Sequence, residues 1–516
     1  MAALKLLLDT NIVIALEDFK PLSADLAALS QKAQLHGLTL FIDEAAIRDV
    51  NRDPDLERRT RTLSKLSRFP LLEEVAHSND DAIVARFGHS KNDNDRCDAL
   101  MLDSLYLGIV DFLISEDVRL HKRAARSGLA DRVFHIAGAV SWIRRTFEPQ
   151  DFRLPYVLAR KAHQISLADP FFETLRDDYP EFDSWFESKC RREHRDCWVV
   201  EIDHRLAGLA IRKDESEIDA QSSNTVRRIL KICTFKISPD FRGEKLGEHL
   251  LKKILWFAQA NAYDLAYLTA YPKQAFLIAL LQQFGFQATR TMANGEQVLE
   301  RQFLHGQLID LVGTETPLVK DMEIYPRYYS GSRVSKFVVP IRPPFHTALF
   351  PEIAEAVPLP MFPNERFVVE ADAGTDRTPG NTIRKVYVCR APTRPLQPGD
   401  LLLFYLSKSD DLVRSQAVTS IGIVEATQLA TSINDLLRSV GRRSVYSHSD
   451  LNAMNPISGS PVLVIDFLLI GHLQPSIHLE KLIDISVFVS RPPQSIARIN
   501  DQAFSRLNDL MTLGYN

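Results

Sequence analysis

Four aspartates stand beside short apolar runs in the first part of the chain, where their carboxylates could bind a metal ion. Asp9 directly follows the apolar run Leu6-Leu7-Leu8, a pattern typical of a buried parallel strand that brings a side chain to the C-terminal edge of a sheet. The other three are Asp49 inside a helical segment, Asp98 at the opening of another, and Asp117 after a second apolar run. Carboxylate oxygens are the ligands that hard divalent cations prefer. Around one or two Mg²⁺ or Mn²⁺ ions, such a cluster would activate water to hydrolyse a phosphodiester.

These segments, in this order, resemble the PIN-domain family of ribonucleases, which includes the toxins of bacterial toxin–antitoxin pairs. The resemblance is carried by Leu8-Asp9-Thr10-Asn11, by residues 42–50, by Asp98-Ala99-Leu100-Met101 and by Ile114-Ser115-Glu116-Asp117. It implies a parallel α/β sheet in residues 1–147 and a catalytic, metal-binding quartet of Asp9, Asp49, Asp98 and Asp117. Thr10 or Ser115 would support a carboxylate or the attacking water through a hydroxyl group.

Two alternatives stay open for these acids. Asp49 stands where the family more often has Glu, and Glu44 is a neighbouring candidate for the same role. Each of the four aspartates could also be a helix cap, because an Asp at a helix start accepts hydrogen bonds from free backbone N–H groups.

A second group of chemistry-bearing residues forms a turn rich in Arg, Lys and Gly, between the apolar strand 230–239 and a helix from 248 to 261. Gly243 and Gly247 let the main chain come close to a ligand, and Arg242 and Lys245 add positive charge. The N–H groups and positive dipole end of a helix start bind phosphate groups. The turn therefore predicts a pyrophosphate site.

The same run resembles motif A of the GNAT acetyltransferases, with its strand, Pro, Arg-Gly and second Gly before the helix. Residues 265–269, Phe284-Gly285-Phe286 and Glu300-Arg301 extend the resemblance over about residues 155–305. It implies acetyl-CoA bound across Arg242 to Gly247, with the acetyl group passing directly to an amine. The residues that it assigns to the cofactor are Ile237, Arg242, Gly243, Lys245, Leu246 and Gly247.

The transfer chemistry of this second block is left open by two departures from the family. Lys245 stands where many members have Gly, and Leu281 stands where many have a Tyr that protonates the departing thiolate. The general acid is therefore unassigned. The alternatives are Tyr267 or Tyr271 as the acid and Glu201 or His204 as a base, the last two being equally explained as polar residues of a hairpin.

The last part of the chain contains a Pro398-Gly399-Asp400 turn before an apolar strand, followed by β-rich runs at 421–425 and 462–467. This pattern resembles the PUA-like (ASCH/EVE) barrels and implies binding of RNA or of a modified nucleobase. Basic residues in 377–394, and three arginines beside an aromatic, would suit phosphates and unstacked bases. These are Arg438, Arg442 and Arg443 with Tyr446. The alternative is an ordinary solvated face.

Composition limits the classes of protein that the chain can be. At 516 residues it is too long for one core, and its 45% hydrophobic and 25% charged residues are ordinary for globular proteins. The net charge of -4 excludes a generally basic nucleic-acid coat. Five cysteines form no even framework, which predicts a reducing, cytoplasmic location. We expect neither a signal peptide nor a membrane span, since no apolar run is long enough.

The expected fold class is α/β multidomain, in four parts. These are a parallel-sheet PIN-like nuclease domain (1–147), an α+β GNAT acetyltransferase-like domain (150–305), a connector (306–375) and a mostly-β PUA-like barrel (376–516).

The leading hypothesis is a metal-dependent endoribonuclease joined to an acetyl-CoA-binding domain and an RNA-binding module, acting as a toxin of a bacterial toxin–antitoxin or stress-response system. Expected partners are RNA, with tRNA among the candidates, a small antitoxin protein, and a second copy of the chain in a homo-oligomer. One alternative is an acetyltransferase acting on a tRNA or protein amine, with the PIN domain as a scaffold. The other is a nucleic-acid-binding regulator without catalysis.

Overall fold

The computed structural model describes residues 4–9, 11–12, 22–52, 54–72, 75–148, 156–202, 205–216, 226–238, 241, 245–306, 309–355, 382–391, 396–409 and 415–515. The chain forms two compact units. The first unit is built from residues 1–152 and 430–462, and the second from residues 153–241, 245–429 and 463–516. Among the helices in the described ranges, none is long and apolar enough to cross a membrane.

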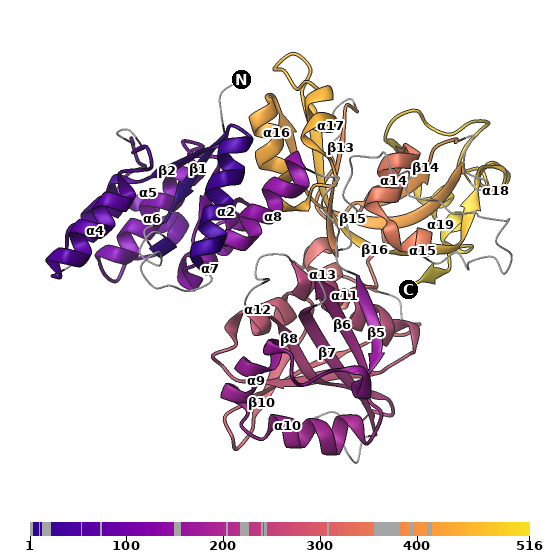
Figure 1. Cartoon of the computed structure of the whole chain (residues 1–516). Helices are drawn as coiled ribbons and strands as arrows, with labels where there is room; N and C mark the ends of the chain where they lie inside the picture. Colours follow the sequence, from indigo (N-terminus) through magenta and orange to yellow (C-terminus); the bar gives the residue numbers. More distant parts are fainter. Residues whose placement is uncertain are drawn as a thin grey trace, which may run out of the picture. The chain divides into compact units, whose positions relative to one another are not determined.

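Four short parallel strands form the described sheet of the first unit, in the order β2-β1-β3-β4. They are β1 (Lys5–Leu8), β2 (Thr39–Ile42), β3 (Phe112–Ile114) and β4 (Val133–Phe134). The neighbours β2 and β1 are labelled side by side in Figure 1. The described helices of residues 22–147 are α2 (Leu22–Leu35), α3 (Glu44–Asn51), α4 (Leu56–Leu66), α5 (Asp80–Phe87), α6 (Asp93–Tyr106), α7 (Val118–Arg126) and α8 (Ile136–Phe147). β1 and β3 are almost wholly buried, as expected for parallel strands with both faces covered. The predicted parallel α/β sheet is thus confirmed.

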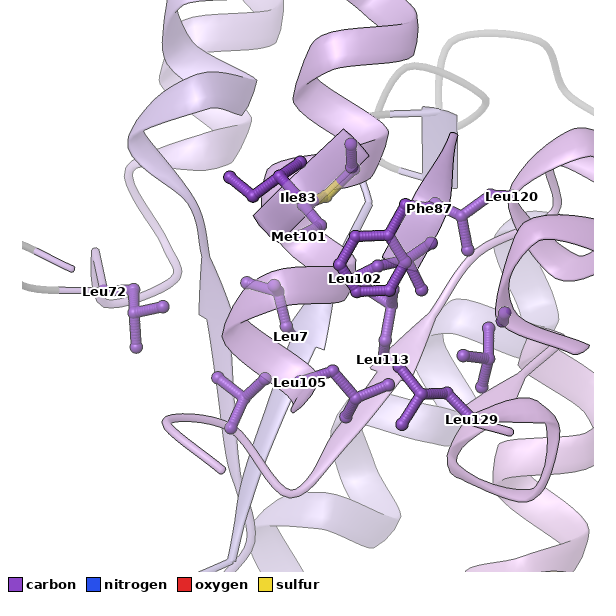
Figure 2. Close-up of a cluster of buried hydrophobic side chains, with 14 residues drawn as sticks. Leu7, Leu72, Ile83, Phe87, Met101, Leu102, Leu105, Leu113, Leu120 and Leu129 are labelled. Atoms are coloured by element: carbon purple, nitrogen blue, oxygen red, sulfur yellow. The ribbon is translucent and has the colours of Figure 1, made fainter. Parts of the chain in front are cut away.

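A cluster of buried apolar side chains holds α5, α6 and α7 against the sheet (Figure 2). Leu102 and Leu105 of α6 lie among Leu7 of β1, Leu113 of β3 and Leu120 of α7. Full burial of one such side chain contributes about 1.5–3 kcal/mol. The cluster therefore fixes α6, which carries Asp98, to the two strands whose ends carry Asp9 and Asp117.

Residues 430–462 belong to the first unit, although they lie inside the module predicted for 376–516. They contain α16 (Ile433–Val440), the short 3-10 helix η8 (Gly441–Arg443) and α17 (His448–Ala453). Arg438 Nη1 lies 3.2 Å from Asp111 Oδ1, and Arg443 Nη2 lies 2.5 Å from Asp131 Oδ2. Tyr446 is only 2% exposed. Aspartates of the N-terminal sheet region thus pair with Arg438 and Arg443, and Tyr446 is buried, while the side chain of Arg442 lies outside the described residues. The predicted basic, aromatic RNA face stays a prediction.

The first sheet of the second unit has seven strands, in the order β10-β11-β9-β8-β7-β6-β5. They are β5 (Val157–Lys161), β6 (Asp196–Ile202), β7 (Arg205–Glu215), β8 (Ile229–Ile237), β9 (Leu265–Ala270), β10 (Gln287–Thr291) and β11 (Gln297–Gln302). Every neighbouring pair is antiparallel except β8 and β9. That parallel pair needs a crossover, which α11 (Leu246–Ala260) supplies. The other helices here are α9 (Glu173–Asp178), α10 (Phe182–Trp185) and α12 (Ala275–Gln283).

The second sheet of this unit is also seven-stranded, in the order β13-β16-β15-β14-β12-β17 with β18 on β16. Its strands are β12 (Lys336–Ile341), β13 (Arg384–Cys389), β14 (Leu401–Leu406), β15 (Ala417–Ala430), β16 (Val462–His478), β17 (Ala497–Ile499) and β18 (Leu513–Gly514). The helices are α13 (Pro317–Ile324), α14 (Pro343–Leu349), α15 (Pro351–Glu355), α18 (Leu479–Asp484) and α19 (Asp501–Asn508). The β-rich character predicted here is confirmed. However, β12, which lies inside the expected connector, pairs with β14 and β17 within this sheet.

Asp321 of α13 is a buried carboxyl whose protonation should affect stability. Its Oδ1 accepts a hydrogen bond from the Tyr329 N–H at 2.5 Å, while Oδ2 is buried without a described partner. Burial raises the pKa of Asp321 to about 7. Between its ordinary pKa near 4 and this value, the folded state holds a proton that the unfolded state has lost. Stability from this group is therefore present below about pH 4 and is lost as the pH rises through about 7.

We expect Asp321→Asn to stabilise the protein at pH 8 by about 2–4 kcal/mol, since the amide keeps the acceptor for Tyr329 and carries no charge. The gain should shrink towards pH 4, where Asp321 is already neutral. Urea unfolding of the two proteins at both pH values measures it. Asp484→Asn, at an exposed position, is the control; a gain independent of pH would contradict the assignment.

Candidate functional site

Two of the predicted acids meet at the C-terminal edge of the N-terminal sheet. β1 and β3 are parallel neighbours with Leu8 opposite Ile114, so Asp9 and the residues after β3 lie at the same edge. Ser115 Oγ donates a hydrogen bond to Asp9 Oδ2 at 2.5 Å and accepts one from the Asp117 N–H at 3.0 Å. Ser115 therefore supports a carboxylate, one of the two roles considered for it. Thr10, the other hydroxyl considered, lies outside the described residues.

Asp98 faces the same two carboxylates from α6. The helix begins at Asp93, with Asn92 as its cap, so Asp98 lies in the second turn and not at the helix start as the sequence suggested. The pKa of Asp98 is raised to about 7, first by burial and then by the negative charges of Asp9 and Asp117, while Arg123 acts in the opposite direction.

The remaining features of this edge favour the structural alternative. Asp117 caps α7, because its Oδ1 accepts hydrogen bonds from the N–H groups of Arg119 and Leu120 at 2.5 and 3.1 Å. α3 carries Asp49, whose side chain lies outside the described residues, and Glu44 is exposed at its start. Among the described side chains, no group of three or more His, Cys, Asp or Glu is arranged to hold a metal ion. The metal site therefore stays a prediction.

Two histidines near this edge were not singled out in the sequence. The rings of His121 and His135 stack with centroids 3.9 Å apart, and His121 Nε2 lies 2.7 Å from the Ser115 carbonyl oxygen. His135 Nδ1 is 3.0 Å from Glu116 Oε2. His121 lies within a helix and His135 precedes one, and neither belongs to a sequence motif. Only the folded structure shows that their rings stack.

The second candidate site is built on the diverging pair β8 and β9. Their parallel register joins only three residue pairs, from Ile229 opposite Leu265 to Lys231 opposite Tyr267. β8 continues to Ile237, bonded along its other edge to β7 as far as Gly208. Over 232–237, in strands that are wholly described, the edge of β8 that faces β9 has no strand partner. An extended ligand with amide groups can pair with such an edge as an added strand would.

The N-terminus of α11 lies directly after β8 in sequence. α11 begins at the buried Leu246, and Lys245 before it has a φ of 56°. A left-handed backbone is strained for a side chain and free of strain for glycine, the residue that the resemblance noted in the sequence leads one to expect at this position. A Cβ on Gly247 would come within 3.3 Å of Leu280 on α12, so this turn packs tightly. Ile237 is half-buried, and Arg242 and Gly243 lie outside the described residues.

The side chains considered for proton transfer lie in different environments in the fold. Leu281 is fully buried in α12. Tyr267 is excluded as the acid, because its buried hydroxyl donates to Glu215. The ring of Tyr271, after the end of β9, packs against that of Tyr179 with centroids 5.5 Å apart. Of the two base candidates, Glu201 is exposed on β6 and His204 lies outside the described residues.

The Pro-Gly-Asp turn of the second unit is structural. Asp400 accepts hydrogen bonds from the Ser335 N–H at 2.7 Å and the Gln397 N–H at 2.8 Å, which closes the turn into β14. Arg384 and Lys385 are buried on β13. The prediction that residues 377–394 present a basic face to RNA is therefore wrong for these two. Arg377 and Arg394 lie outside the described residues.

Comparison with known proteins gives a family match for one part of the chain. No curated protein matches the chain. Similar solved structures include an ASCH protein from Zymomonas mobilis (18% identity, 35% of this chain and 97% of that chain, TM-score 0.24). The PaiA N-acetyltransferase from Thermoplasma acidophilum in complex with coenzyme A is another (13% identity, 28% and 99%, TM-score 0.23). A third is a GNAT family acetyltransferase from Elizabethkingia anophelis with acetyl-CoA bound (13% identity, 28% and 98%, TM-score 0.20). Residues 160–286, which contain the diverging strands and the start of α11, match the model of the acetyltransferase (GNAT) family.

Proposed function

We propose that the second unit binds acetyl-CoA and transfers its acetyl group to an amine. The observation that carries this proposal is the divergence of β8 from β9 inside the region that matches the GNAT family. A tRNA amine or a protein amine is the acceptor that we consider. An RNA ligand, a small antitoxin and self-association stay predictions from the sequence.

The chain's own residues would hold the cofactor in two places. The open edge of β8 over 232–237 offers backbone groups to the amides of the pantetheine arm. The first N–H groups of α11, at Leu246 and Gly247, and the ammonium of Lys245 would face the pyrophosphate. Ile237 would border both parts, and Arg242 and Gly243 complete the set expected from the sequence. Bound acetyl-CoA would supply an activated thioester.

The described residues assign no side chain that protonates the departing thiolate. Leu281 is apolar and Tyr267 is held by Glu215, so Tyr271 is the alternative that stays open. This unit would therefore act mainly by orienting the thioester, which is a contribution of proximity and alignment.

Acetyl-CoA binding is the first test. We expect the cofactor to stabilise the full chain against heat, by about 2.7 kcal/mol at about 100 times its Kd. Lys245→Glu should weaken binding about tenfold, because it replaces attraction to the pyrophosphate by repulsion. Lys245→Gly is the matched control: it keeps the left-handed backbone without strain and should lose much less affinity. Titration calorimetry measures all three proteins, and a wild-type chain that binds no acetyl-CoA would refute the proposal.

A second candidate function rests on the acid cluster that the sequence predicts in the first unit. We infer that Asp9, Asp98 and Asp117 bind a divalent cation and that this edge cleaves RNA. The support is the link between Asp9 and Asp117 through Ser115 at one sheet edge, together with the burial of Asp98 near both carboxylates. The donor set is all carboxylate, which suits Mg²⁺ or Mn²⁺. Bound metal would supply an activated water, and Asp49 would complete the set.

A further inference from the structure

One face of α11 is occupied by the second sheet of the same unit. Glu248, Lys252 and Trp256 are spaced by four residues and therefore lie along one stripe of the helix. Each contacts an element beyond the GNAT-matching region. Lys252 Nζ pairs with Glu352 of α15, and Trp256 Nε1–H donates to Tyr325 Oη at 2.8 Å. Tyr325 Oη in turn donates to the Leu469 carbonyl oxygen of β16 at 2.7 Å.

The third contact of the stripe lies at the start of the helix. Glu248 is the third residue of α11, and its Oε1 lies 2.9 Å from Nη1 of Arg384 on β13. Arg384 is 9% exposed. Its Nε lies 2.9 Å from Glu425 Oε1 on β15, so one guanidinium connects two strands of the second sheet to the first turn of α11.

The same guanidinium also reaches the end of α12. Arg384 Nη2 donates to Gln283 Oε1 at 3.3 Å, and the guanidinium carbon lies 5.3 Å from the centroid of the Phe284 ring. α12 is the helix whose Leu280 packs against Gly247. Arg384 therefore contacts both helices that meet at the proposed pyrophosphate site.

An arginine held in this way can fix the position of the groups that it contacts, in addition to supplying a positive charge. A guanidinium that is planar and bonded on three sides has little freedom to move. Glu248, in the first helical turn, would by itself disfavour an anion at the N-terminus of α11, since both carry negative charge. Pairing with Arg384 offsets that charge and also fixes the turn.

We propose that Arg384 is a positioning residue, which holds the first turn of α11 in the geometry that binds acetyl-CoA. The second sheet thereby sets the affinity of the GNAT-type domain for its cofactor. This inference rests on the proposed acetyl-CoA site. It explains why the polar stripe of α11 is buried against the second sheet, where a free-standing domain would expose it to water.

The test compares acetyl-CoA affinity in the full chain by titration calorimetry, for the wild type, Arg384→Gln and Glu248→Gln. Arg384→Gln should weaken binding about tenfold, within the range of coupling energies known for residues that touch neither ligand. Arg384→Lys should recover part of the loss. Asp501→Asn is the control. It removes the 2.6 Å ion pair between Asp501 and Lys336 of the second sheet, which does not contact α11. The affinity for acetyl-CoA should stay within about twofold of the wild-type value.

Glu248→Gln decides between positioning and simple electrostatics by the sign of its effect. If charge alone mattered, removing this carboxylate near the pyrophosphate would strengthen binding. If Arg384 positions the turn through Glu248, the variant binds about threefold more weakly. The double variant should then lose less than the sum of the single losses.

The outcomes separate this inference from the proposed function. A wild-type chain that fails to bind acetyl-CoA overturns both. If the wild-type chain binds acetyl-CoA and Glu248→Gln binds it equally tightly or more tightly, only the positioning role is overturned. Because Glu248→Gln keeps the side chain's shape, it decides the matter even where Arg384→Gln fails to fold.

Discussion

Gly285→Ala is expected to destabilise the second unit by about 3 kcal/mol or more, from two separate causes. Gly285 has a φ of +80°, a conformation that costs a residue with a Cβ about 1–2 kcal/mol. A Cβ there would also overlap the Glu323 carbonyl oxygen and lie 3.0 Å from its carbonyl carbon. That carbonyl belongs to the backbone of α13, so relief requires moving a helix. The Gly of the Phe-Gly-Phe motif is therefore required by packing.

Gly295→Ala separates the two causes. Gly295 lies in the turn between β10 and β11 with a φ of +86° and nothing within 4 Å of an added Cβ. Its replacement should cost only the backbone strain, about 1–2 kcal/mol. Denaturant unfolding of both variants gives the difference, which measures the contact with α13. If both variants lose the same free energy of unfolding, the overlap with the Glu323 carbonyl is relieved without an energetic cost.

Asp9→Asn is expected to reduce the Mg²⁺- or Mn²⁺-dependent RNA cleavage that we propose for the first unit by about 100-fold or more. Loss of a supporting residue of a metal site alone costs 10- to 100-fold, and Asp9 would be a direct ligand. The amide keeps the size of the side chain and can still accept the hydrogen bond from Ser115 Oγ. Fold and stability should therefore change little, while an anionic ligand is lost.

Asp55→Asn is the matched control for this experiment. Asp55 caps α4 in the same domain by accepting from the Arg58 N–H at 3.0 Å, and Asn is an equally good cap. Cleavage should be unchanged in this variant. Cleavage that survives in Asp9→Asn, or that needs no divalent ion in the wild type, would leave Asp9, Asp98 and Asp117 as structural residues only.

Much of the local architecture was predictable from the chain's own pattern. The strands β1 and β3, which precede Asp9 and Asp117 in the chain, are apolar because they are buried on both faces, and this signal is visible residue by residue. The β8–turn–α11 segment was predictable for the same reason, since a strand, a turn and a helix differ in their spacing of apolar residues. By contrast, the start of α6 was misplaced, because the capping Asn92 stands before a polar first turn that carries no apolar period.

The sequence by itself therefore determined the main strands, helices and tight turns and the acids and glycines near their ends, apart from β12 and the start of α6. Only the tertiary structure decided what the basic residues do. Arg384, Arg438 and Arg443 looked like surface charges for RNA, yet carboxylates of other elements pair with them. The partners Arg384 and Glu248 are 136 residues apart in the chain. Periodicity and capping act within a few residues, whereas an ion pair forms wherever the fold brings two charges together. No local sequence pattern can therefore predict which charges will pair.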